Sequence, residues 1–162
     1  MANPDRPQGF RPYGDVILAI PVVLGATAYP GDFLHLESDG LADPAVAGED
    51  IYGLCLQYGV ANDTVMMSAS PNQIYIGQGD GSDINVQTDI GNLCDILATA
   101  GNTTYNLSRQ EVDTSTIGTG SGGQLVILGV DGRVGNSLGA QVEVLVKINE
   151  NQAFGETDFA GI

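Results

Sequence analysis

Apolar residues along this chain occur in short runs separated by glycine, asparagine and aspartate. The clearest run is residues 141–149, QVEVLVKIN, in which every second residue from Val142 to Ile148 is a β-branched apolar residue. Such alternation places one set of side chains on a single face of a strand. Residues 124–130, QLVILGV, are instead continuously apolar, which is typical of a strand covered on both faces.

Further runs of the same kind predict more strands between turn residues. They cover residues 16–20, 33–37, 51–59, 64–68, 73–78 and 84–88, and residues 93–101 fit either a strand or a single helical turn. Long segments with helical periodicity are lacking, and strands recur at spacings of about ten residues with Gly, Asp and Asn between them. This pattern predicts an all-β fold, a single antiparallel β-sandwich or barrel.

The two ends of the chain differ from this body. We therefore divide it into an extended N-terminal arm (1–14), a β-sandwich or barrel body (15–150) and a C-terminal tail (151–162). The arm carries three prolines, which remove backbone donors and prevent a helix. The tail lacks periodicity but carries Phe154 and Phe159, so we expect it to dock on a neighbour.

Residues 15–32, DVILAIPVVLGATAYPGD, resemble a secretory signal with a small-residue cleavage site. Asp15, however, stands where such a signal carries positive charge, and Pro21 divides a run rich in β-branched residues. The run is also shorter than the roughly 20 apolar residues that a membrane span needs. We interpret it as strand and expect a protein that is made and used without export.

The charge balance narrows the possible partners. The chain has 20 acidic and 5 basic residues, a net charge of −15. Affinity for nucleic acid comes mainly from Lys and Arg that neutralise phosphates, so we expect no nucleic-acid partner and no adsorption to anionic membranes. The acidic exterior fits either a solvated surface or a basic partner.

The residues that carry most enzyme chemistry are scarce. Cys55 and Cys94 lie in apolar contexts and are expected to be buried free thiols, with a disulfide left open. His35 is the one histidine, on the same strand face as Phe33 and Glu37, and is expected to be structural. Because the chain has no second histidine, we expect neither a catalytic triad nor a metal site made of several histidines.

Loop motifs give no stronger signal. The glycine-rich residues 118–122 have no flanking helix, as a nucleophile elbow would require. Asp80 and Asp83, with Asp89 nearby, offer carboxylates of the kind that hold calcium, but their spacing matches no EF-hand. Aspartate next to glycine is typical of turns. We therefore expect no enzyme, no cofactor and no metal.

The arm is the better candidate for function. Arg6 and Arg11 offer bidentate bonds to carboxylates, and Phe10 and Tyr13 offer aromatic anchors. An extended, proline-rich segment loses little entropy on docking and can add to an exposed strand edge. We expect the arm to bind neighbouring protein subunits and the body to fold without it.

Three segments resemble head decoration (cement) proteins of tailed bacteriophages. They are MANPDRPQGFRP (1–12), GDFLHLESDGLADPAVAGEDIYGLCL (31–56) and LVKINENQ (145–152). The resemblance implies an all-β structural virion protein, often a homotrimer, that binds the capsid exterior. The partner would be the major capsid protein, and the bound decoration protein would stabilise the contacts between capsid subunits. Assembly in the host cytoplasm would explain the missing export signal.

Two other functions stay open. One is a structural protein of a phage tail or fibre. The other is a carbohydrate-binding β-sandwich module, which would use exposed aromatics on one face, with Tyr52, Tyr58 and Tyr75 as candidates. The absence of tryptophan from the chain disfavours the carbohydrate-binding module.

Overall fold

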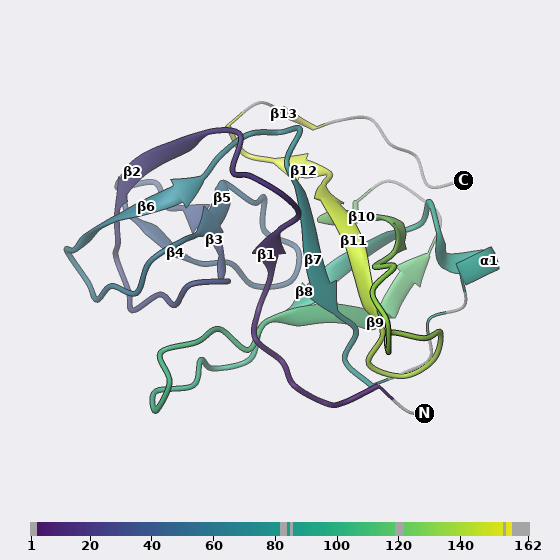
Figure 1. The fold of residues 1–162 in the computed structure, drawn as a ribbon. Helices are drawn as coiled ribbons and strands as arrows, with labels where there is room; N and C mark the ends of the chain where they lie inside the picture. Colours follow the sequence, from purple (N-terminus) through teal and green to yellow (C-terminus); the bar gives the residue numbers. More distant parts are fainter. Residues whose placement is uncertain (1–2, 82–83, 85, 119–121, 154, 157–162) are drawn as a thin grey trace.

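The computed structural model describes residues 3–81, 84, 86–118, 122–153 and 155–156. Its strands form two antiparallel sheets and a small two-stranded ribbon, β12 paired with β13. The six-stranded sheet has the order β1-β7-β11-β10-β8-β9, and the five-stranded sheet has the order β2-β6-β5-β3-β4 (Figure 1). The predicted all-β, antiparallel fold is therefore confirmed, and of the two predicted forms, sandwich or barrel, the described residues have the sandwich-like one.

The strands have the following bounds. The six-stranded sheet contains β1 (Arg11–Pro12), β7 (Ile74–Gln78), β8 (Leu93–Leu97), β9 (Glu111–Gly118), β10 (Leu125–Val130) and β11 (Glu143–Ile148). The five-stranded sheet contains β2 (Ala19–Val23), β3 (Phe33–Leu36), β4 (Ala42–Pro44), β5 (Gly53–Cys55) and β6 (Thr64–Ser68). The ribbon pairs β12 (Glu150–Asn151) with β13 (Gly155–Glu156).

Two hydrophobic cores follow from the alternation of side chains along the strands. In β3, Phe33 belongs to the core between the sheets, whereas its neighbour Leu34 belongs to a second core on the other face. In β5, Leu54 and Cys55 divide in the same way. The five-stranded sheet thus packs against a core on each face, and it curls so that Leu24, directly after β2, forms a bridge to Ala42 of β4.

Several strand predictions need correction. Residues 84–88 were predicted as strand, but α1 (Val86–Asp89) is a single helical turn. Asn92 explains it, because its side chain donates to Thr88 O at 2.6 Å and its backbone N–H donates to Asp89 O at 3.1 Å. Within the described ranges, no helix is long and apolar enough to cross a membrane.

Other boundaries also differ. The ambiguous residues 93–101 contain strand β8, and the strand expected at 16–20 begins at Ala19 and runs past Pro21. β1, β4 and β9 were not predicted. β9 is an edge strand whose polar, partly exposed residues lack a regular apolar pattern.

The N-terminal arm packs on the chain's own body. Phe10 is only 2% exposed and belongs to the core between the sheets, with its ring 4.5 Å from that of Phe33. Gly77 makes room for it, because a Cβ there would lie 2.2 Å from the Phe10 ring. Gly9 has a positive φ of 71° and lies so close to Ser108 that a side chain would not fit.

Backbone and polar contacts hold the rest of the arm. β1 pairs with β7 at the edge of the six-stranded sheet, as Figure 1 shows. The Gln78 side chain accepts from Arg6 N–H at 3.1 Å and donates to Pro4 O at 2.7 Å. The Asn3 side chain donates to Ser137 O at 2.7 Å. The arm thus lies against the body, and its aromatic residue Phe10 completes the core of its own chain.

A pair of aromatic substitutions tests this placement. Phe10→Ala removes a buried ring and should lower the free energy of unfolding by about 3–5 kcal/mol. Tyr13→Ala removes an exposed ring and should change it by no more than about 0.5 kcal/mol. Urea denaturation of both variants measures the difference. Equal, small effects would mean that the arm does not contribute to the core.

Candidate partner-binding surface

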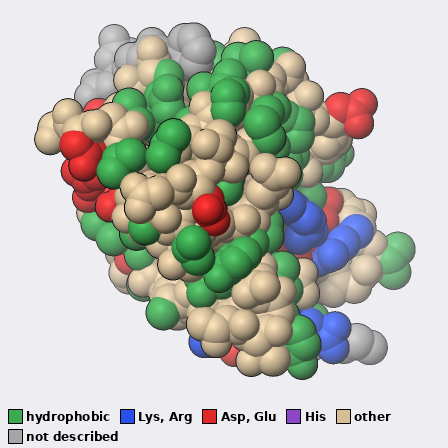
Figure 2. Space-filling view, turned by 90° about the vertical axis from the view of Figure 1, so that its left-hand side faces the viewer, with side chains coloured by type: hydrophobic (Ala, Val, Ile, Leu, Met, Phe, Trp, Pro, Cys, Tyr) green, Lys and Arg blue, Asp and Glu red, His purple; other side chains and the backbone are tan. Residues whose placement is uncertain are grey.

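An apolar surface lies where the arm passes into the five-stranded sheet. We call it the 13–23 surface, after the segment that forms it. Its large exposed side chains are Tyr13, Val16, Ile17, Leu18 and Val23. Ile17 is 62% exposed and Tyr13 is 51% exposed. Figure 2 views the molecule from the β2 side and shows hydrophobic side chains spread across this face, with few acidic ones among them.

The surface includes the free edge of the five-stranded sheet. Ala69 N–H donates to Leu18 O at 3.0 Å, and Leu24 N–H donates to Asp63 O at 2.9 Å. Because successive residues of a strand direct their polar backbone groups to opposite sides, the odd-numbered residues of β2 direct theirs away from β6. Pro21 is one of these and has no N–H, which blunts the edge against strand addition. A contact at this edge would therefore be made mainly through side chains.

The backbone of this surface is held in place. Ile17 N–H donates to Gln73 Oε1 at 2.9 Å, although Ile17 lies outside any strand. Tyr13 N–H donates to Ile74 O at 2.8 Å. A surface fixed before binding loses less entropy when a partner docks. These contacts explain how apolar side chains can remain exposed on an ordered backbone.

The structure separates the residues that the sequence had grouped as one binding arm. Arg6 and Tyr13 are exposed, Arg11 is partly exposed, and Phe10 is buried. Phe10 is therefore not available to a partner in this fold, which corrects its expected role as an intermolecular anchor. Phe154 and Phe159, the expected anchors of the tail, lie outside the described residues.

Three of the five basic residues surround one cleft of about 410 Å³ beside the arm. Arg11 and Arg133 both form ion pairs with Glu143, the former at 2.7 Å, and Arg133 also lies 3.3 Å from Asp131. The charges of Arg11 and Arg133 are balanced by those of Glu143 and Asp131. Arg6 supplies the remaining positive charge. The cleft is therefore not a strongly basic site.

The tyrosines proposed for a carbohydrate-binding face do not form one. Tyr75 is fully buried, and burial raises its pKa to about 12. Tyr52 packs against the second core, while Tyr58 is exposed with its ring 5.5 Å from that of Tyr29. Tyr75 therefore cannot contribute to an exposed aromatic platform.

The other residues whose side chains could take part in catalysis or metal binding have structural roles. Cys55 and Cys94 are free and buried, as expected, and burial raises the pKa of the Cys55 thiol to about 11 and that of the Cys94 thiol further. A raised pKa disfavours the reactive thiolate. Asp80 Oδ1 accepts bonds from the N–H and hydroxyl of Thr114. Asp83, its expected calcium-binding neighbour, lies outside the described residues.

Comparison with known proteins adds no family. No protein-family model matches the chain, and no curated protein matches it. The site must therefore be interpreted from its own geometry.

Sequence reasoning missed most of the 13–23 surface. Residues 16–20 were interpreted as a strand, and their side chains were not considered as a binding surface. The available signal was the length of the apolar run from Val16 to Val23, which exceeds what one short edge strand can bury on a single face.

A carboxylate beside the arm predicts a pH effect on stability. Burial, together with the nearby charges of Asp5 and Asp80, raises the pKa of Glu111 to about 7, although Arg109 acts in the opposite direction. The folded chain therefore holds a proton that the unfolded chain releases near the ordinary value of 4.5. Between these two pH values the free energy of unfolding should fall as pH rises.

Glu111→Gln should remove this contribution. Urea denaturation at pH 5 and pH 8 should show a smaller loss of stability on raising the pH for the variant than for the wild type. An equal loss of stability between pH 5 and pH 8 in the two proteins would show that Glu111 has the same pKa in the folded and unfolded chain.

Proposed function

We propose that this chain is a structural virion protein that binds the outside of a phage capsid and stabilises contacts between major capsid protein subunits. The resemblance of residues 1–12, 31–56 and 145–152 to head decoration proteins supports the class. The 13–23 surface is the observation that carries the proposal, because it exposes large apolar side chains on an ordered backbone of the β-sandwich.

The chemistry of the surface suits a protein partner. Five large apolar side chains of one short segment are solvent-exposed here, and exposed apolar surface is a feature of protein–protein interaction sites. Tyr13 provides an amphipathic aromatic ring beside the aliphatic residues, and aromatic residues are enriched among those that dominate binding energy. We assign the major capsid protein as the partner that covers this surface.

Charge supports the same location. A net charge of −15 opposes contact with packaged DNA and favours the exterior of the shell. It also steers the protein towards basic patches on a capsid. We propose that the chain acts as a homotrimer, since three linked copies of one modest surface bind far more tightly than a single copy.

The arm has a different part in this proposal from the one expected from sequence. Phe10 fixes the arm to the body, so the arm does not thread over a neighbour as a free strand. It presents Tyr13 at the start of the 13–23 surface and Arg6 beside the cleft. Docking then occurs between preformed surfaces.

A charge placed on this surface tests the proposal. Ile17→Glu should weaken binding to capsids that lack the protein by about tenfold to a hundredfold, because a carboxylate would be buried in an apolar contact. The fold should persist, since Ile17 is exposed. Co-sedimentation of purified protein with capsids of the parent phage measures the binding.

Val134→Glu is the matched control. Val134 is fully exposed in the turn after β10, outside the 13–23 surface, and its substitution makes the same change in charge. It should bind like the wild type. Equal binding by the Ile17 and Val134 variants would contradict the assigned surface. Rings or stacks in electron micrographs of assembled particles, in place of groups of three on a shell, would indicate a tail protein.

A further inference from the structure

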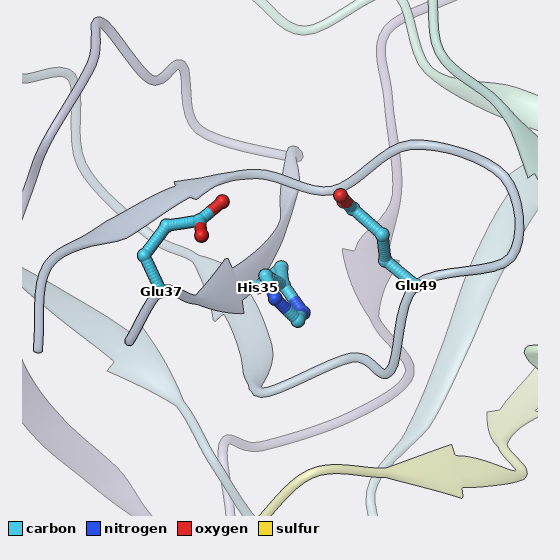
Figure 3. A group of neighbouring side chains, drawn as sticks. All are labelled: His35, Glu37 and Glu49. Atoms are coloured by element: carbon cyan, nitrogen blue, oxygen red, sulfur yellow. The ribbon is translucent and has the colours of Figure 1, made fainter. Parts of the chain in front are cut away.

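A second group of side chains, apart from the 13–23 surface, has the composition of a metal site. His35, Glu37 and Glu49 each direct a ligand atom into one space, and these atoms lie within 4.8 Å of one another. Figure 3 shows the imidazole of His35 between the two glutamates. Imidazole with carboxylates is a ligand set found in protein zinc sites.

Local structure explains how the three residues meet. His35 lies in β3 and Glu37 directly follows it, so the alternation of an extended chain places both on one face. Glu49 comes from the loop between β4 and β5, where its N–H donates to Val46 O and its Oε2 accepts from Val46 N–H. Its other carboxylate oxygen remains for a ligand.

A contact outside the group orients the histidine. His35 Nδ1 lies 2.9 Å from the backbone oxygen of Asp50. A carbonyl can only accept, so Nδ1 carries the proton and Nε2 keeps its lone pair. Metal-binding histidines in proteins almost always donate their second ring N–H to a carbonyl or carboxylate in this way.

Residues 150–152 form hydrogen bonds to both segments that supply the ligands. The Gln152 side chain accepts from Leu36 N–H at 2.7 Å and donates to Leu36 O at 2.8 Å, between His35 and Glu37 in the chain. Ile51 N–H donates to Glu150 O at 2.8 Å. The ligands therefore sit on a braced backbone, and Glu37 alone among them has an exposed side chain that can move freely.

We propose that His35 Nε2, Glu37 and Glu49 bind a divalent transition metal ion of the zinc class, with a fourth position open to solvent. Tetrahedral coordination at about 2.0–2.2 Å requires ligand atoms about 3.4 Å apart. The ligand atoms, which lie within 4.8 Å of one another, would therefore have to move closer on binding, and the exposed Glu37 side chain has the most freedom to do so. The bound ion joins the end of β3 to the loop that contains Glu49. This inference does not depend on the proposed function.

The single histidine of the chain makes the test direct. Untagged, EDTA-treated protein is titrated with Zn²⁺, and the imidazole signals of His35 are followed by NMR alongside calorimetry. We expect one ion per chain, a shift of the His35 signals that saturates at the same ratio, and a raised melting temperature. With Co²⁺, a tetrahedral visible spectrum should appear.

Variants separate this site from general attraction of cations to an acidic protein. His35→Gln should abolish the calorimetric signal and the Co²⁺ spectrum, and its amide can still donate to Asp50 O. Glu49→Gln should weaken binding at least tenfold. Asp15→Asn makes the same change in charge at an exposed position and should bind like the wild type.

Two results would overturn the site. One is Zn²⁺ binding, or its absence, with no change in the His35 signals. The other is equal weakening by Glu49→Gln and Asp15→Asn, which would show that only the overall charge attracts the ion.

Discussion

The burial of Phe10 between the two sheets is the contact on which the arrangement of this protein depends. Its ring packs against Phe33 and occupies the space left by the missing side chain of Gly77. Since Phe10 is fixed, the arm must follow β7 as strand β1 and then turn out at Tyr13. The apolar residues that follow are consequently delivered to the surface. One buried ring thus determines which part of the N-terminal region a partner can reach.

Buried or partly buried glutamine side chains complete this arrangement. Their amides form the hydrogen bonds to backbone groups that a neighbouring strand would otherwise form. Gln78 holds the arm, Gln73 holds Ile17, and Gln152 holds Leu36 beside the proposed metal ligands. Each amide offers a donor and an acceptor, so it can satisfy irregular segments that no strand pairs. The 13–23 surface and the His35 group therefore share one feature, a backbone segment that a glutamine side chain from elsewhere in the chain holds in place.

Much of the fold could be predicted because alternation along β11 and the apolar run of β10 reflect burial directly. β9 was missed because an edge strand buries little, and β1 because its two residues pair only through a long-range contact with β7. Glu49 could not be grouped with His35 from sequence, since a loop brings it there. The role of Phe10 was reversed for a similar reason. An aromatic residue in a proline-rich arm fits a neighbour's pocket or its own core equally well, and the difference lies in Gly77, far away in the chain.

Hydrogen exchange of the free protein and of the assembled particle tests the central claim most directly. The Phe10 amide donates to Gly31 O at 2.9 Å in the single chain. Peptides that contain Phe10 should therefore be protected already in the free protein, and peptides covering residues 15–23 should gain protection in the particle. Rapid exchange around Phe10 in the free protein, with protection only after assembly, would contradict the account, because the arm would then be completing a neighbouring subunit.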